Sequence, residues 1–209
     1  MRLLLVFLLP PALVAQVGDE ALRKGPNQDW LSYHGDYTGR RHSPLTEINP
    51  RTVSRLAPKW VRQFPGTGDL ETVPLVYQGV MYATIPNEVY ALDAVTGREI
   101  WHYRAEGTRR SAVNRGVAML GDRIYFATAD CHLVALRRTT GGVIWDREYA
   151  ASDSHFSCTA APLAVKDKII VGVAASGQTC FIAALSAETG NEAWRVWTVP
   201  RKGEPGSDT

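Results

Sequence analysis

The chain has 209 residues, and its 23 lysines and arginines nearly balance its 21 aspartates and glutamates, which gives a formal net charge of +2. This balance provides no electrostatic reason to expect nucleic acid or an anionic membrane surface as a partner. A hydrophobic content of 45% with 9% aromatic residues is ordinary for a globular protein, so a chain of this length can bury a sizeable core.

The first predicted element is an export signal at residues 1–15. Arg2 supplies a positive charge, and no residue from Leu3 to Ala15 is charged. Such a stretch is shorter than the about 20 apolar residues that span a bilayer, and it fits the apolar region of a secretory signal with Ala15 at the cleavage site. No later stretch is apolar for long enough to cross a membrane. We therefore expect a periplasmic or secreted mature chain.

Residues 16–60 are expected to form an N-terminal extension with a strand, and residues 61–209 a repeated β structure. An eleven-residue unit occurs three times in the second part. Each copy begins with Ala-Leu, has Thr-Gly at its sixth and seventh positions, and ends in Trp; the copies are ALDAVTGREIW (91–101), ALRRTTGGVIW (135–145) and ALSAETGNEAW (184–194). Trp60 is a fainter echo of the same pattern.

Each unit follows two short apolar runs joined by a polar turn, which is a hairpin pattern. The turns are Gln78-Gly79, Gly121-Asp122 and Lys166-Asp167. Four short antiparallel strands within about 40 to 50 residues describe one blade of a β-propeller. The predicted fold class is therefore all-β, with three four-stranded blades that end near Trp101, Trp145 and Trp194.

The repeated residues have predicted physical roles. Gly97, Gly141 and Gly190 are expected to adopt positive φ at the turn. The tryptophans are expected to bury their indoles between blades, with room left by the alanine that opens the unit in the neighbouring blade. Only the first unit has an aspartate, Asp93, at its third position, so we expect weaker side-chain hydrogen bonds at the other two turns.

Three blades do not close a propeller, since closed propellers have about 4 to 8. An open stack leaves one sheet flank and its tryptophan exposed. We therefore expect the chain to be a truncated part of a longer propeller, and not stable by itself.

Three cysteines, Cys131, Cys158 and Cys180, allow one disulfide and one thiol in an oxidising compartment. A Cys158–Cys180 pair is one option, and three small buried residues is the interpretation that we favour. The cysteines and the five histidines show no spacing typical of a metal site.

Several ordered segments resemble the quinoprotein alcohol dehydrogenases, which use pyrroloquinoline quinone (PQQ). They are DWLSYHGDYTGRRHSPLTEINPRTVSRLAPKW (29–60), VNRGVA (113–118), CTAAPLAVKDKIIVGVA (158–174) and WTVPRKGEPGSDT (197–209). The resemblance implies an eight-bladed propeller that binds PQQ and calcium, an alcohol substrate and a separate electron acceptor. It also implies that the catalytic aspartate belongs to later blades, so we assign no catalytic residue to this chain.

The resemblance assigns PQQ contacts to Glu71, Arg115 and Thr159. A planar tricarboxylate cofactor suits the fixed fork of an arginine. The alternatives are a solvated loop carboxylate for Glu71, a salt bridge between blades for Arg115 and a strand-edge hydroxyl for Thr159.

Two departures from the family pattern matter. Arg109 and Arg110 stand where many relatives have adjacent cysteines, and Arg110 becomes a further candidate for cofactor contact. The loop ASGQTC (175–180) has Gln178 and no acid where the family has a calcium-binding glutamate, which should weaken calcium binding. We therefore assign no metal ligand, and we expect the chain alone to show neither calcium-dependent PQQ binding nor alcohol oxidation. The alternative function is a non-catalytic exported propeller, a scaffold or sensor, that has lost its cofactor.

Overall fold

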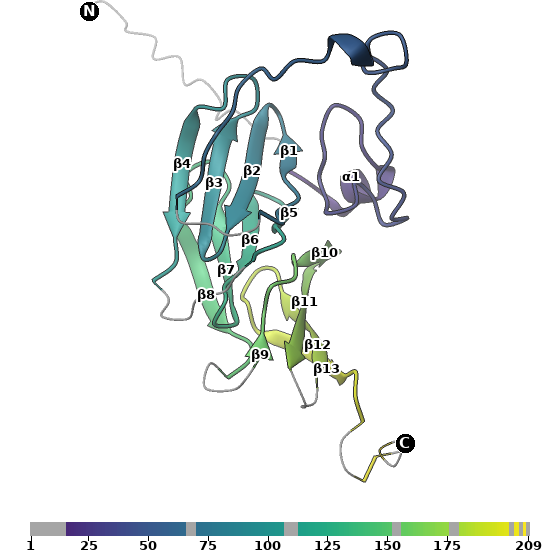
Figure 1. Ribbon diagram of the computed structural model, residues 1–209. Helices are drawn as coiled ribbons and strands as arrows, with labels where there is room; N and C mark the ends of the chain where they lie inside the picture. The colour runs from purple at the N-terminus through teal and green to yellow at the C-terminus, as the bar shows by residue number, and fades with distance from the viewer. Residues whose placement is uncertain are drawn as a thin grey trace, which may run out of the picture.

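Three antiparallel sheets follow one another along the chain (Figure 1). The computed structural model describes residues 16–65, 70–106, 113–151, 156–175, 180–200, 203, 204 and 207. The first sheet contains β1 (Leu75–Tyr77), β2 (Val80–Ile85), β3 (Glu88–Asp93) and β4 (Glu99–Arg104). The second contains β5 (Val117–Leu120), β6 (Arg123–Ala127), β7 (His132–Arg137) and β8 (Val143–Glu148). The third contains β10 (Leu163–Val165), β11 (Lys168–Ala175), β12 (Phe181–Ser186) and β13 (Glu192–Trp197), and the short β9 (Phe156–Ser157) also pairs with β11.

Each sheet is a blade whose strands pair in the order of the chain. The predicted polar turns join the first two strands of each blade, and Gln78, Gly79, Gly121 and Lys166 adopt positive φ there. The sheets do not close into a ring, and their first strands, β1, β5 and β10, lie together in the middle of the molecule (Figure 1). The predicted all-β fold of three open propeller blades is confirmed.

The tryptophans that end the first two units, Trp101 and Trp145, pack on the glycine of the next unit, and Trp60 packs on the glycine of the first unit. The three glycines have φ of 71°, 72° and 72°, as predicted. A Cβ atom added at any of them would collide with an indole, at 2.6 Å for Gly97 and Trp60, 2.6 Å for Gly141 and Trp101, and 2.8 Å for Gly190 and Trp145. Trp60 therefore performs the same contact for the first blade as the tryptophans of the repeated unit do for the next two.

A hydrogen bond accompanies each of these contacts. The indole Nε1 atoms donate to the fourth-position carbonyl of the next unit, at 3.1 Å for Trp60 and Ala94, 2.9 Å for Trp101 and Arg138, and 3.3 Å for Trp145 and Ala187. The alanine that opens each unit lies opposite the tryptophan of its own blade, with the pairs Ala91–Trp101, Ala135–Trp145 and Ala184–Trp194. The contact with the neighbouring blade is thus made at the glycine.

The side-chain bonds of the turns differ between units as predicted. Asp93 Oδ1 accepts hydrogen bonds from the backbone N–H of Val95 and from both the N–H and the hydroxyl of Thr96. In the third unit Ser186 Oγ accepts one, at 3.3 Å from the N–H of Thr189. The second unit has Arg137 at this position, which offers no acceptor atom on its side chain.

Residues 16–60 run across one side of the blades. They form the helix α1 (Asp19–Lys24) and the 3₁₀ turn Val53–Arg55, and in place of the expected strand they make two isolated bridges, Val17 with Gly121 and Trp30 with Val76. Asp19 also accepts from the N–H of Lys166 at 3.0 Å. The segment therefore contacts a hairpin turn or first strand of all three blades. The predicted signal at residues 1–15 lies outside the described residues.

One hydrophobic cluster extends through the three blades, and Leu22 of α1 belongs to it. A smaller cluster of Ile85, Tyr90 and Leu92 packs under Trp60 and Phe64 at the flank of the first blade. At the other flank Trp194 is 43% exposed, whereas Trp101 and Trp145 are each 8% exposed.

Candidate functional site

Glu71, Arg115 and Thr159 come together from three successive blades. They stand 44 residues apart, each shortly before the first strand of its blade. One terminal nitrogen of Arg115, Nη2, lies 2.7 Å from Glu71 Oε2, and the other, Nη1, donates to Thr159 Oγ1 at 2.6 Å. We call these three residues the entry row.

The backbone holds the entry row together. The N–H of Val73 donates to the carbonyl of Arg115 at 3.1 Å, and the N–H of Arg115 donates to the carbonyl of Thr159 at 3.2 Å. Gly116 permits this close approach, since its φ is 128° and a Cβ there would lie 3.0 Å from the carbonyl oxygen of Val73. The three segments that enter the blades therefore run side by side.

The entry row is accessible from solvent and carries one positive and one negative charge, on Arg115 and Glu71. The side chains of Arg115 and Glu71 are each 39% exposed. Because both charges remain hydrated, their attraction contributes little to the stability of the fold, at most about 1 kcal/mol. The two contacts use two of the five N–H donors of a guanidinium. The arrangement places a planar cation, an acceptor carboxylate and a hydroxyl next to one another where the three segments enter their blades.

The structure thus groups three of the four predicted cofactor contacts. The alternative interpretation of Arg115 as a salt bridge between blades describes its contact with Glu71 correctly. The fourth candidate, Arg110, lies outside the described residues together with Arg109, and so does Gln178. Within the described ranges no group of three or more His, Cys, Asp or Glu side chains could hold a metal ion.

The favoured interpretation of the cysteines, three small buried residues, was wrong, and the structure has the other option of one disulfide and one thiol. Cys131 and Cys158 form a disulfide with a Cα–Cα distance of 5.3 Å, so neither three thiols nor a Cys158–Cys180 pair describes the protein. The physical reason is the packing of the blades: the turn between β6 and β7 carries Cys131 to the segment that enters the third blade, where Cys158 precedes Thr159. Cys180 lies outside this disulfide and is half-buried.

Sequence reasoning also missed Asn114. Its side chain is 4% exposed, and its Nδ2 donates to the carbonyl of Ala127 at 2.9 Å while its Oδ1 accepts from the N–H of Gly116 at 3.0 Å. The sequence feature that could have identified Asn114 is its position directly before Arg115 in the segment VNRGVA, which enters the second blade.

The open stack of blades matches a known family of proteins. A family model described as the β-propeller domain of glucose, ethanol and alcohol dehydrogenases that use PQQ matches residues 30–207. The chain belongs to this family.

Individual relatives support the same assignment. The chain is 37% identical to the quinohemoprotein alcohol dehydrogenase ADH IIB of Pseudomonas putida over 97% of its own length and 31% of that protein. Its structure is similar to that of a quinohemoprotein alcohol dehydrogenase from Comamonas testosteroni, with a TM-score of 0.77 and 33% identity over 85% of this chain and 28% of the other. A europium-containing methanol dehydrogenase is similar with a TM-score of 0.73 and 31% identity over 84% of this chain and 33% of the other. The chain therefore spans about a third of the length of these relatives. Within its described residues, no helix is both long and apolar enough to cross a membrane.

Proposed function

We propose that this chain is the N-terminal part of an exported PQQ-dependent dehydrogenase that oxidises an alcohol, and that the entry row contributes one edge of the cofactor site. The observation that carries the proposal is the position of Arg115, which bridges a carboxylate of one blade entry and a hydroxyl of another. The alcohol dehydrogenases among the relatives support the reaction class.

The residues of the entry row fit the chemistry of PQQ. The cofactor carries three carboxylates, and a guanidinium recognises a carboxylate through parallel N–H donors. Thr159 adds a hydroxyl, and Glu71 holds the fork of Arg115 while offering an acceptor to polar hydrogens. When bound, PQQ supplies the two-electron acceptor of the oxidation. The protein's contribution at this edge is to bind and orient, and we assign it no proton transfer and no metal ligand.

PQQ titration of the isotope-labelled chain tests the proposal. We expect PQQ to shift the NMR signals of the Arg115 and Thr159 backbone amides with weak affinity, Kd of roughly 0.1 to 1 mM, because one edge of a site provides only part of the binding energy. Added calcium should change this affinity little. Arg115→Ala should abolish the shifts, and Arg115→Lys should weaken them because a lysine lacks the planar fork.

Arg98→Ala is the matched control, since Arg98 is exposed on a turn and its removal changes the net charge by the same amount. PQQ that perturbs no signal, or that loses affinity equally in Arg98→Ala and Arg115→Ala, would contradict the cofactor role. The first of these outcomes would favour a non-catalytic exported propeller.

A further inference from the structure

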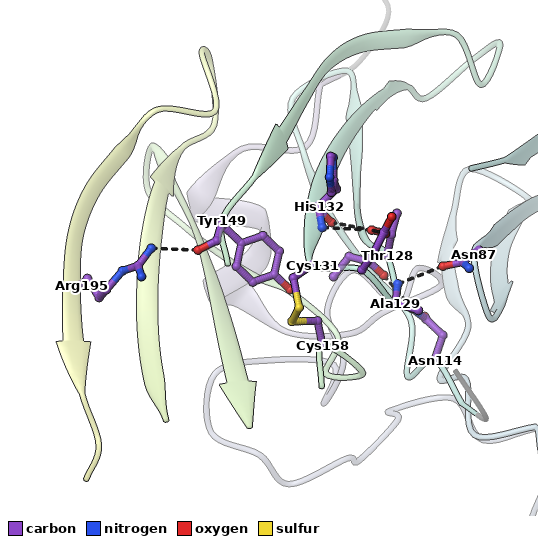
Figure 2. Close-up of a disulfide and its surroundings, with 11 residues drawn as sticks. Asn87, Asn114, Thr128, Ala129, Cys131, His132, Tyr149, Cys158 and Arg195 are labelled. Atoms are coloured by element: carbon purple, nitrogen blue, oxygen red, sulfur yellow. Dashed lines mark hydrogen bonds between the residues drawn. A yellow bond between two sulfur atoms is a disulfide. The ribbon is translucent and has the colours of Figure 1, made fainter. Parts of the chain in front are cut away.

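The turn that joins β6 to β7 in the second blade contacts the blades on both sides of it. We call residues Ala127–Cys131 the hub turn. The N–H of Ala129 donates to Asn87 Oδ1 of the first blade at 2.9 Å. On the opposite side Cys131 is bonded to Cys158 in the segment that enters the third blade. Figure 2 shows these connections arranged around one short stretch of backbone.

The hub turn is itself held in one conformation. The hydroxyl of Thr128 contacts Asp130 Oδ1 at 2.5 Å and accepts from the N–H of His132 at 3.0 Å. The N–H of Cys131 donates to the carbonyl of Thr128 at 3.1 Å, and the carbonyl of Cys131 accepts from the N–H of Tyr149 at 3.0 Å. Cys131 has a φ of 67°, which is uncommon for a residue other than glycine.

Burial separates the hub turn from solvent. Thr128 is 2% exposed, Cys131 is fully buried and Cys158 is 2% exposed. The ring of Tyr149 lies beside the disulfide (Figure 2), and burial raises the pKa of its hydroxyl above the usual range. The carbonyl of Tyr149 accepts from Arg195 Nη2 of β13 at 2.8 Å, which adds a second connection to the third blade.

Two residues bound to the hub turn are chain neighbours of the entry row. Asn114, whose side chain donates to the carbonyl of Ala127, directly precedes Arg115. Cys158, in the disulfide, directly precedes Thr159. The hub turn therefore fixes the backbone just before two members of the entry row, which come from different blades.

We propose that the hub turn, through its disulfide and Asn114, is the positioning element of the entry row and holds Thr159 at hydrogen-bonding distance from Arg115. The significance for a cofactor rests on the proposed function, whereas the mechanical claim concerns this chain alone. A crosslink that acted only on the unfolded chain would stabilise all sheets alike by reducing unfolded-state entropy. A positioning crosslink controls local opening of the segments that it joins.

Amide hydrogen exchange separates these two roles. In the double variant Cys131→Ala and Cys158→Ala, we expect exchange at the N–H of Arg115 to accelerate about tenfold, which corresponds to about 1.4 kcal/mol of local opening free energy. This N–H reports directly on the entry row because its acceptor is the carbonyl of Thr159. Amides of β2 and β3 that exchange by local opening should keep their rates.

Gly141→Ala provides the comparison for general destabilisation, because it strains a turn outside the hub and leaves the disulfide in place. Conditions are chosen so that both proteins have equal global stability. Equal exchange at Arg115 in the two proteins, or uniform acceleration across β2, β3 and the entry row, would overturn the positioning role.

Asn114→Ala keeps the test decisive if the double cysteine variant does not fold. It removes the acceptor of the Gly116 N–H and the donor to Ala127, so exchange at Gly116 should accelerate about tenfold while β2 and β3 are unchanged. Unchanged exchange at Gly116 would also overturn the proposal. PQQ titration of the same proteins is read separately: failure of the unmodified chain to bind PQQ refutes the proposed function, and the exchange rates still decide the role of the hub turn.

Discussion

At the scale of single residues, the glycine of the repeated unit satisfies two independent demands. Gly141 has a φ of 72°, and an added Cβ would lie 2.6 Å from the ring of Trp101. Gly121 has a similar φ of 64° but no atom within 4 Å of an added Cβ. The two glycines therefore allow the cost of backbone conformation to be separated from the cost of the indole contact.

We predict that Gly141→Ala lowers the free energy of unfolding by about 2 to 4 kcal/mol, because left-handed backbone strain and overpacking against Trp101 add together. Gly121→Ala should lower it by about 1 kcal/mol, from backbone strain alone. Urea unfolding followed by circular dichroism measures both values. Equal losses would show that the indole contact adds nothing to the requirement for glycine.

The turn of the first unit carries a pH-dependent contribution. Hydrogen bonds from the hydroxyl of Thr96, and then from its backbone N–H, lower the pKa of Asp93 below its usual value. A group with a lowered folded-state pKa stabilises the protein above its unfolded-state pKa, and this stabilisation disappears as the pH falls through the folded-state pKa.

We therefore predict that Asp93→Asn reduces the loss of stability between about pH 5 and pH 2, measured by urea unfolding at a series of pH values. Glu20→Gln, which removes an exposed carboxylate of α1, is the control for the change in net charge. Identical pH profiles for the unmodified chain and Asp93→Asn would contradict the role of this turn.

At the scale of elements, the tryptophans of the first two blades attach the final strand of their blade to the next blade. Trp101 is 8% exposed and donates its indole N–H to the carbonyl of Arg138 in the second blade. Trp194 occupies the equivalent position in the third blade and is 43% exposed. The same residue type at the same position in the unit therefore has two different environments.

We predict that Trp101→Phe lowers the free energy of unfolding by about 1 to 3 kcal/mol, through the lost hydrogen bond and the smaller buried ring. Trp194→Phe should change it by no more than about 0.5 kcal/mol, since a largely exposed side chain contributes little. Equilibrium unfolding in urea measures both. A loss at Trp194 as large as that at Trp101 would mean that the indole of Trp194 is buried in solution.

The repeat made the fold predictable at this scale. The spacing of the units, the hairpin turns and the glycines at positive φ all follow from patterns of neighbouring residues. The contacts between blades were harder to predict from the sequence. Trp101 contacts Gly141 in the next blade, and no pattern of neighbouring residues identifies that partner. The disulfide was missed for the same reason: Cys131 and Cys158 meet through the packing of two blades, and the spacing of cysteines does not encode that packing. Glu71, Arg115 and Thr159 were identified through a family resemblance, and their grouping required the structure.

At the scale of the whole molecule, the disulfide joins the second blade to the third. It encloses a loop with a sequence separation of 27 residues. In the chain-entropy description a loop of this length stabilises the folded state by about 3 to 4 kcal/mol. Because Cys131 is fully buried and Cys158 is 2% exposed, reductants reach the sulfur atoms only after local opening.

We predict that alkylation of the denatured, unreduced protein modifies one cysteine, Cys180, and that reduction before alkylation raises the number to three. Mass spectrometry of the intact chain distinguishes the two products. The reduced protein should also unfold at a lower urea concentration than the oxidised protein. Three alkylated cysteines without reduction would show that the disulfide is absent in solution.

The contact between an indole and the next glycine is directional, since Trp101 and Trp145 each lie in one blade and contact the glycine of the blade that follows. A duplicated blade inserted between two others could therefore form both contacts, with its glycine against the tryptophan of the preceding blade and its tryptophan against the glycine of the following blade. Blade number can therefore change by whole units during evolution while every seam keeps the same chemistry. A deletion that removes part of a unit has no such tolerance, because it leaves a tryptophan and a glycine from different seams facing each other out of register.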